Sequence, residues 1–239
     1  MVCKKTGSTS RVVPETNIVK VQLRKRPFEV GGLRLAYHLF VASQGLHGQR
    51  TLDGKHVSEV HLVAKQSKFE EKYADRLKVV GHFFEQHSYA AARAEAFNQV
   101  LRVIDPVTYK RPVARFVTAE VYRLRDVDTP GGFQYLLAEQ FIQGSFTKFN
   151  DNDGYVNPAP SSGNDVAQAF SHWTIQESKR TSAVVDIQGA EGAWTDPQVH
   201  SVERVFGDAD LGERGIFLCL FVENAHLQSP LSRAGSDIR

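Results

Sequence analysis

The sequence predicts an α+β protein with two lobes. Alternating apolar and polar residues, the pattern of half-buried strands, fill much of the first half of the 239-residue chain. From Tyr89 onward the apolar residues recur at the helical period, and the second half combines another helix with a short buried strand. Hydrophobic residues make up 41% of the chain and charged residues 23%, which is ordinary for a globular protein. A chain of this length can bury one large core or two adjoining ones.

The charge balance and the cysteines argue against several classes of protein. A net charge of +2, from 29 basic and 27 acidic residues, argues against a nucleic-acid partner, and the basic run 24–26 is interpreted as a solvated stretch before a strand. Cys3 and Cys219 lie far apart and outside any CxxC pair, so a disulfide framework is not expected. No run approaches the roughly 18 apolar residues of a membrane span, and no secretory signal is recognisable. We therefore expect a cytoplasmic protein without a membrane partner.

The first half of the chain opens on two predicted strands. Residues 1–19 are rich in Ser, Thr and Lys and predict a flexible lead-in. Apolar residues alternate from Leu33 to Tyr37, and a second strand is predicted from Val57 to Ala64. The turns between these strands are assigned to Gly45, Gly48, Asp53 and Gly54.

A helix and a hairpin are predicted next. Ser88 is the predicted N-cap of a helix with one apolar face, made of Tyr89, Ala92, Ala96, Val100 and Val103. Alternation resumes from Val113 to Leu124, and Phe133 to Ile142 is its predicted hairpin partner. The Thr-Pro-Gly-Gly sequence at 129–132 predicts the turn between these two strands.

The last third of the chain contains a loop, a helix and a buried strand. A polar loop is predicted at 150–154, and a helix is predicted from the spacing of Val166, Phe170, Trp173 and Glu177. The short apolar run from Ala183 to Ile187 predicts a strand buried on both faces. Residues 229–239 predict a flexible tail.

Two short acidic motifs follow the predicted buried strand. Asp186 begins Asp-Ile-Gln-Gly, and ten residues later Asp196 lies in Thr-Asp-Pro-Gln. Carboxylates with the side-chain amide of Gln188 are suitable ligands for the Mg²⁺ of a nucleotide, and a further carboxylate can accept a hydroxyl proton. Asp is also common in turns and helix caps, so on the residues alone the structural interpretation stays open.

Three further features have both a functional and a structural interpretation. Lys65 closes an alternating run, from which a lysine can contact nucleotide phosphates or simply be solvated. Glu139 lies at a strand end, where a backbone can meet an adenine edge. The segment 207–215 contains three glycines and can approach a ligand closely or form a plain surface loop.

Taken in order, these segments resemble the alpha-kinase family of atypical Ser/Thr protein kinases. The Asp-Ile-Gln-Gly and Thr-Asp-Pro-Gln pair at this separation is specific to that family. The matching segments are 27–37, 62–65, 136–152, 169–172, 184–189, 195–200 and 206–215, and they span about residues 20–222. The resemblance implies a two-lobed kinase-like fold with an ATP cleft between an N-lobe of about 20–138 and a C-lobe of about 139–228.

The resemblance also implies a role for each candidate residue. Asp186, Lys65 and Asp196 would be catalytic, with Asp186 as base or hydroxyl positioner. Gln188 and Asp196 would hold Mg²⁺. The expected ATP-binding residues are Arg34 in the glycine-turn region, Lys65 on the phosphates, Glu139 in a hinge facing adenine, Gln188, and the loop from Gly207 to Gly212 near substrate and phosphates. Lys110 or Arg111 would supply a second basic residue for phosphate.

The chain departs from the family at two places. Alpha-kinases usually hold a structural zinc with two His and two Cys. His172 retains the first position, whereas the expected thiols are missing from 223–229 and Cys219 lies too early. We therefore expect a zinc-free C-lobe, held by apolar contacts among Leu218, Leu220, Phe221 and Trp173. Asp210 replaces a common Asn and is expected to add negative charge near the phosphates.

The implied activity is transfer of the γ-phosphate of Mg–ATP to a Ser or Thr hydroxyl of a protein substrate. The alternative is a pseudokinase, or a nucleotide-responsive binding module, with the same fold and little turnover. The missing zinc ligands and Asp210 favour this alternative, whereas Lys65, Asp186, Gln188 and Asp196 argue against it. A phosphotransferase acting on a small molecule is a third interpretation, which would require a closed pocket.

Overall fold

The chain folds into two units. The computed structural model describes residues 2–4, 13–14, 21–42, 59–69, 75–125, 132–190 and 192–226. Unit 1 is formed by Met1–Phe84 with Thr118–Phe141, and unit 2 by Glu85–Val117 with Ile142–Arg239. Residues 85–117, which the N-lobe predicted over 20–138 would contain, therefore group with unit 2.

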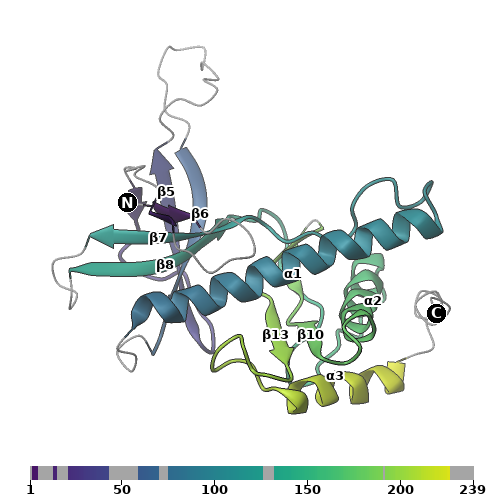
Figure 1. The fold of residues 1–239 in the computed structure, drawn as a ribbon. Coiled ribbons are helices and arrows are strands. Elements are labelled where there is room, and N and C mark those ends of the chain that lie inside the picture. Colours follow the sequence, from purple (N-terminus) through teal and green to yellow (C-terminus); the bar gives the residue numbers. More distant parts are fainter. Residues whose placement is uncertain are drawn as a thin grey trace, which may run out of the picture. The chain divides into compact units, whose positions relative to one another are not determined.

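Unit 1 is built on one antiparallel sheet, drawn in Figure 1. Along the sheet the order is β2-β1-β7-β8-β6-β5-β3, and β4 pairs with β5. The strands are β1 (Val2–Lys4), β2 (Val13–Pro14), β3 (Val21–Leu23), β4 (Glu29–Val30), β5 (Arg34–Ala42), β6 (Glu59–Ser67), β7 (Ala119–Arg125) and β8 (Phe133–Gln140). The short strands β1 and β2 fall within the predicted lead-in 1–19, and the predicted tail 229–239 lies outside the described residues.

Alternation along the central strands separates two apolar faces. Leu39, Ala64 and Leu136 pack together on one face of the sheet. Leu137, the next residue of β8, points to the other face, where it packs with Val80 of the helix that follows β6. The sheet is therefore buried on both sides over its centre.

The predicted strands of unit 1 are found with shifted ends. The strand predicted for 57–64 runs instead to Ser67, so Lys65 lies inside β6 rather than at its end. Of the strand predicted for 113–124, only the part from Ala119 is formed. Residues before it form an isolated bridge between Phe116 and Trp194. The predicted turn residues at 45, 48, 53 and 54 lie outside the described residues.

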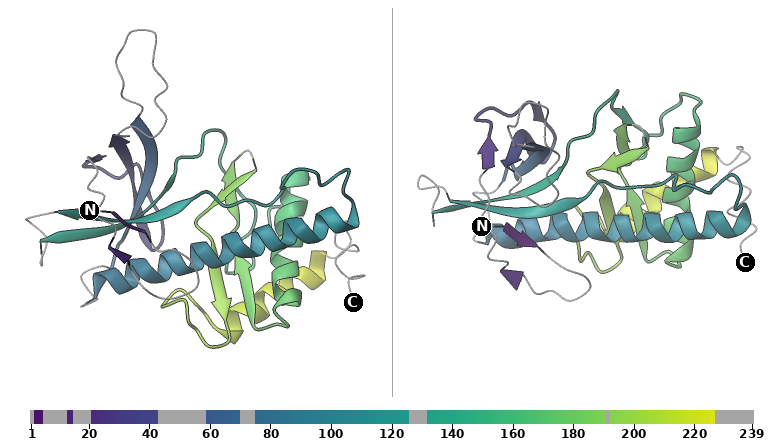
Figure 2. Two further views of the ribbon diagram at one scale, coloured as in Figure 1. Left: turned by 45° about the horizontal axis from the view of Figure 1, so that its top comes forward. Right: turned by 90° about the horizontal axis from the view of Figure 1, so that it is seen from above.

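The helix α1 (Arg76–Ile104) is longer than predicted and begins earlier. Figure 2 shows it as one unbroken helix in both views. The predicted N-cap, Ser88, is wrong, since the carboxylate of Asp75 accepts the backbone N–H of Lys78 at 3.0 Å. The predicted apolar face is also wrong, because Val103 is 85% exposed. The buried residues of α1 are Val80, Gln86, His87, Ala90, Ala94, Phe97 and Asn98.

Unit 2 combines most of α1 and two further helices with two small sheets. The further helices are α2 (Ser162–Glu177), capped by the Ser161 side chain as it accepts the N–H of Asn164, and α3 (Glu213–His226). β10 (Ser182–Val185) pairs antiparallel with β13 (Gln198–Ser201). The second sheet has the order β12 (Ala193–Thr195), β11 (Gln188–Ala190), β9 (Thr147–Lys148). None of the helices in the described ranges has the length and apolar character needed to cross a bilayer.

Aromatic side chains fill the main core of unit 2. Phe170 lies with its ring 5.6 Å from Phe97 and 5.4 Å from Trp194. Trp173 packs against this cluster, whereas Leu220 packs against a separate cluster around Ile175. The predicted single group of Trp173 with the α3 leucines is therefore wrong, and the Phe221 side chain lies outside the described residues.

Candidate functional site

Two of the predicted site residues form a buried ion pair within unit 1. Lys65 donates to the carboxylate of Glu139 at 2.9 Å, and the side chains are only 8% and 1% exposed. The pairing of β6 with β8 sets Lys65 opposite Leu137 and Val63 opposite Glu139, so both charged side chains share one face. Burying two charges is costly unless the pair is well formed. The side chain of Glu139 is thus a partner of Lys65, while its expected place in a hinge facing adenine stays a prediction.

Arg34 lies beside the predicted glycine turn. It is the first residue of β5, and its carbonyl accepts the N–H of Gly31 at 2.9 Å, which closes the turn between β4 and β5. The Arg34 guanidinium stacks over the Phe83 ring at 4.5 Å. The turn and the arginine are thus held in one place within unit 1.

In unit 2 both acidic motifs bring an aspartate into an unusual backbone conformation. Asp186 follows β10 with φ of 60°, and Asp196 follows β12 with φ of 55°. Non-glycine residues adopt this left-handed region at a cost, and Asp and Asn tolerate it best. Such strained residues cluster at functional sites. Both side chains are half-buried.

The second carboxylate and the amide are brought together by the pairing of β11 with β12. Gln188 lies opposite Thr195, the residue before Asp196, and its amide donates to the Asp196 carbonyl at 3.4 Å. Gly189 adopts φ of 154°, and a Cβ there would lie 2.0 Å from the Ala193 carbonyl oxygen. The glycine of the Asp-Ile-Gln-Gly motif is therefore required by this close approach.

Lys148 is a site residue that the sequence reasoning missed. Its ammonium lies 2.7 Å from the Asp186 carboxylate, and β9 places it directly opposite Gln188. Burial alone lowers the pKa of Lys148, but the hydrogen bond and attraction from Asp186, with attraction from Asp151 and Asp196, raise it above its usual value. The lysine therefore stays charged beside these three carboxylates.

A buried amide fixes the chain next to Asp186. Asn150 accepts the backbone N–H of Ile187 at 2.9 Å and donates to Gln168 and Ser171 at 3.0 Å each. This residue begins the predicted polar loop, but only 5% of it is exposed. It therefore anchors the backbone on which Asp186 is presented.

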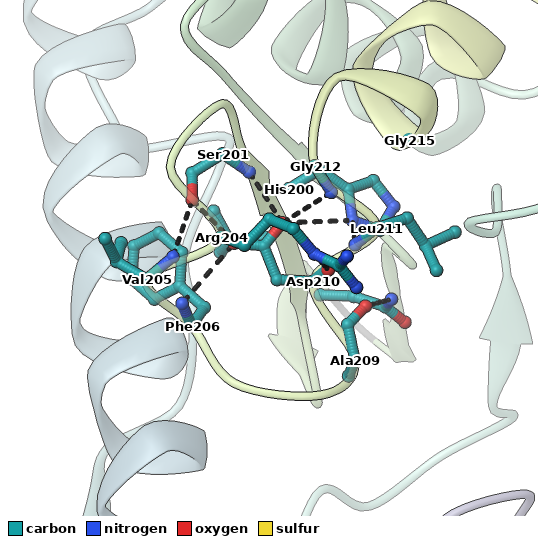
Figure 3. Close-up of polar contacts among 12 residues, drawn as sticks. His200, Ser201, Arg204, Val205, Phe206, Ala209, Asp210, Leu211, Gly212 and Gly215 are labelled. Atoms are coloured by element: carbon teal, nitrogen blue, oxygen red, sulfur yellow. Dashed lines mark hydrogen bonds and ion pairs between the residues drawn. The ribbon is translucent and has the colours of Figure 1, made fainter.

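The glycine-containing segment folds around Asp210, as Figure 3 shows. The Asp210 side chain is 0% exposed and accepts the Ser201 N–H at 2.8 Å, the Ser201 hydroxyl at 2.5 Å, and the N–H groups of Gly212 and Phe206 at 2.9 and 3.4 Å. Asp210 was expected to add negative charge near the phosphates; its carboxylate is buried among these donors, and its effect on phosphate binding stays a prediction. Gly212 has φ of 68°, and a Cβ there would crowd Arg204 at 3.0 Å. The segment is neither a plain surface loop nor freely mobile around this carboxylate.

Replacing Asp210 with asparagine should destabilise unit 2. The new NH₂ group would face N–H or O–H donors, so at least one buried hydrogen bond would be lost and another turned into a repulsive contact. We expect the free energy of unfolding to fall by about 2 kcal/mol in urea titrations. Asp208→Asn, which removes the same charge from an exposed neighbour, should change it by less than about 0.5 kcal/mol. Equal effects of the two substitutions would contradict this role.

His200 is a buried neutral imidazole beside Asp210. It is 0% exposed, and its Nδ1 accepts the Leu211 N–H at 3.1 Å, so the proton is on Nε2. Among the described residues Nε2 has no hydrogen-bond partner. A Cβ on Gly215 would lie 2.3 Å from the ring, so only glycine fits there. Burial lowers the pKa of His200, against an opposing attraction from Asp210 and Asp153.

Stability should therefore fall on mild acidification. The unfolded histidine takes up a proton near its ordinary pKa of 6.5, whereas folded His200 does so only at lower pH, so protons favour the unfolded state as the pH falls below 6.5. Between pH 7.5 and 5.5 we expect a loss of up to about 1.4 kcal/mol from this residue. His200→Gln keeps an acceptor for the Leu211 N–H. Urea titrations at pH 7.5 and 5.5 should therefore show a smaller loss of unfolding free energy in this variant. An equal loss in the variant and the unaltered protein would contradict the assignment.

The predicted zinc position can be described only in part. His172 is half-buried on α2, and the thiol of Cys219 contacts the Gly215 carbonyl at 3.0 Å. Within the described ranges no three His, Cys, Asp or Glu side chains are grouped to hold a metal ion. From 221 to 226 only the backbone is described, so the zinc-free C-lobe stays a prediction.

The chain also resembles known proteins in sequence. The model of the alpha-kinase family matches residues 29–229. Alpha-protein kinase vwkA of Dictyostelium discoideum is 32% identical over 203 residues, covering 83% of this chain and 29% of the relative. Eukaryotic elongation factor 2 kinase of Caenorhabditis elegans is 43% identical over 93 residues, covering 38% of this chain and 12% of the relative. The chain thus spans less than a third of the length of either protein.

Solved structures share the fold. The alpha-kinase domain of myosin heavy chain kinase A in complex with AMP aligns with a TM-score of 0.71 and 24% identity, covering 91% of this chain and 90% of that one. The same kinase domain in complex with AMP-PNP gives 0.67 and 25%, covering 85% and 84%. The predicted α+β fold of the alpha-kinase type is confirmed. The chain belongs to the alpha-kinase family.

Proposed function

We propose that this protein is a kinase that transfers the γ-phosphoryl group of Mg–ATP to a Ser or Thr hydroxyl of a protein substrate. The observation that carries the proposal is the cluster of Asp186, Gln188, Asp196 and Lys148 in unit 2. The AMP and AMP-PNP complexes of the myosin heavy chain kinase A domain support nucleotide binding. A cytoplasmic location is part of the proposal.

The residues present fit a magnesium nucleotide. Carboxylate and amide oxygens are the hard ligands that Mg²⁺ prefers, and Asp196 and Gln188, linked by the Gln188 amide on the Asp196 backbone carbonyl, would supply them. When bound, Mg²⁺ neutralises charge on the phosphates. Lys65, fixed by Glu139, is the proposed phosphate-binding amine of unit 1. Arg34, Gly207 and Gly212 are proposed to contact the nucleotide.

Asp186 is the proposed base or hydroxyl positioner. Phosphoryl transfer relies on positioning and charge stabilisation more than on covalent chemistry by the protein. The left-handed backbone, the Asn150 anchor and the Lys148 ion pair together fix where the Asp186 carboxylate points. The carboxylate can therefore receive the proton of a substrate hydroxyl without rearrangement.

Lys148→Met should lower kcat by about 10- to 100-fold with a smaller effect on KM for ATP. The change removes the cation that holds Asp186 in place and balances the neighbouring carboxylates, but it retains most of the side-chain volume. Because Lys148 is 43% exposed, we expect little change in melting temperature. Lys68→Met, at an exposed lysine of unit 1, is the matched control. Steady-state kinetics with kcat unchanged in Lys148→Met would contradict the positioning role.

Incubation with labelled ATP separates the kinase from the pseudokinase. We expect the purified protein, supplied with Mg²⁺, to label Ser or Thr of a basic protein acceptor. No label should be incorporated when EDTA is present to chelate Mg²⁺. Asp186→Asn tolerates the same backbone conformation and should bind nucleotide without transfer. Nucleotide binding with no transfer by the unaltered protein would favour the pseudokinase and overturn the kinase proposal.

A further inference from the structure

The C-terminal end of α1 exposes aliphatic side chains that no part of the catalytic cluster uses. Val103 is 85% exposed, Val107 in the following loop is 86% exposed, and Ile104 between them is 49% exposed. Single exposed aliphatic residues are normal, but here three exposed aliphatic residues fall within five positions of the chain. Together with Arg102, Lys110 and Arg111 these residues are called the α1-end surface.

The loop that carries this surface is held in one conformation. The Asp105 carboxylate accepts the N–H groups of Val107 and Thr108 at 3.1 and 3.0 Å. Buried Asn98 donates to the Ala114 carbonyl and accepts the N–H of the same residue at 3.1 Å. A loop ordered in this way loses little conformational entropy when a partner binds. The aliphatic side chains are therefore presented on a fixed support.

The charge around the aliphatic residues is mainly positive. Residues 102–115 contain four basic residues and one acidic residue, a net charge of +3, while the whole chain carries +2. Arg102, Lys110 and Arg111 are exposed. Lys110 or Arg111 was predicted to supply a second basic residue for phosphate, and both lie in the loop that follows α1. Complementary charge here means an acidic partner.

A protein segment fits this surface better than a membrane does. Lipid-binding clusters usually contain about 4–8 neighbouring basic residues, and the four of residues 102–115 are at the lower end of that range. Asp105 lies between the aliphatic residues, and its hydrogen bonds, chiefly with Thr108, lower the pKa of its carboxyl, so it stays negative. A fixed anion beside the apolar groups opposes contact with anionic lipid, but a peptide can direct its own acidic groups to the flanking cations.

We infer that the α1-end surface docks an acidic segment of a partner protein that also carries aliphatic side chains. Val103, Ile104 and Val107 would bury the aliphatic groups, and Arg102, Lys110 and Arg111 would pair with the acidic ones. This inference stands on unit 2 alone and does not depend on the proposed phosphoryl transfer.

Fluorescence anisotropy with a labelled peptide tests the inference. The probe is the twelve-residue peptide EELLEELLEELL, and the protein is the full chain. We expect saturable binding that weakens as salt is raised, because ion pairs at a surface are screened. The double variant Val103→Ser with Val107→Ser, and the double variant Lys110→Glu with Arg111→Glu, should each weaken binding at least tenfold. All four side chains are exposed, so both variants should keep the melting temperature.

Matched substitutions elsewhere control for non-specific hydrophobic binding and for the change in net charge. Val60→Ser, at a 47% exposed valine, and Lys25→Glu with Arg26→Glu should each change the affinity by less than twofold. A peptide with Ser in place of Leu should bind at least tenfold more weakly. Equal binding by the α1-end variants, or no peptide binding at all, would overturn the inference. It would also be overturned if vesicles of phosphatidylserine and phosphatidylcholine bound through this surface and the peptide did not.

Discussion

Asp196→Asn should reduce kcat/KM for Mg–ATP by about 1000-fold while the melting temperature stays within about 2 °C. The substitution removes the charge expected to hold Mg²⁺ but keeps a residue that tolerates φ of 55°. The Gln188 amide contacts the Asp196 backbone carbonyl rather than the side chain, so this support survives. The loss should therefore appear in catalysis and not in folding. Initial rates at several Mg²⁺ concentrations measure it.

The alanine variant separates the effect of losing the carboxylate from the effect of losing a residue that tolerates the left-handed backbone. Alanine tolerates a left-handed backbone less well, so Asp196→Ala should lose the same activity and, in addition, about 1 kcal/mol of stability. A matched change at exposed Glu95 of α1, Glu95→Gln, should leave both quantities nearly unchanged. Near-normal turnover in Asp196→Asn would show that this carboxylate is not part of the reaction centre.

Lys65→Ala should cost both ATP use and stability. The Glu139 carboxylate is 1% exposed, so removing its partner leaves a buried charge without the 2.9 Å ion pair. Breaking a buried pair in this way typically costs about 3–5 kcal/mol. Loss of the proposed phosphate contact should lower kcat/KM for ATP by at least about 100-fold. Urea titration and steady-state kinetics measure the two losses separately.

A double substitution shows whether activity is lost only because the fold is weakened. Lys65→Met with Glu139→Gln removes both charges and fills a similar volume, so most of the stability should return. Activity should not return, since no amine is left for the phosphates. If the double variant recovered turnover together with stability, Lys65 would be a structural residue and its catalytic assignment would be wrong.

Period-two alternation was sufficient to predict the central strands of unit 1. The runs around Leu35, Val63 and Leu137 lie in β5, β6 and β8. The pattern identifies them because successive side chains of a strand point to opposite faces of the sheet. The same pattern overextended the strand before Ala119, where the chain instead bridges to Trp194. Alternation shows that a segment can pair, but the partner decides where the pairing stops.

Helix α1 shows how a local pattern can identify the wrong face. The predicted residues Tyr89 and Val103 are apolar at helical spacing, yet the buried stripe runs through Ala94 and Phe97. Phe97 is buried because its ring meets Phe170, which comes from a distant part of the chain. Tertiary contacts of this kind leave no trace in the local period.

The acidic motifs of the site were recognisable, but their partners were not. Asp186 and Asp196 stand out in sequence, and the structure brings Gln188 to Asp196. Lys148 belongs to a strand of only two residues, too short for any periodic signal. The burial of Asp210 depends on donors from Ser201, Phe206 and Gly212, which surround it only after folding.

A crystal structure of the protein with Mg²⁺ and a non-hydrolysable ATP analogue tests the central claim most directly. The account predicts that one Mg²⁺ is bound by the Asp196 carboxylate and the Gln188 side-chain oxygen, that the Lys65 ammonium contacts a phosphate, and that Asp186 keeps its Lys148 partner. A nucleotide bound with its metal away from Gln188 and Asp196, or phosphates that do not reach Lys65, would contradict it.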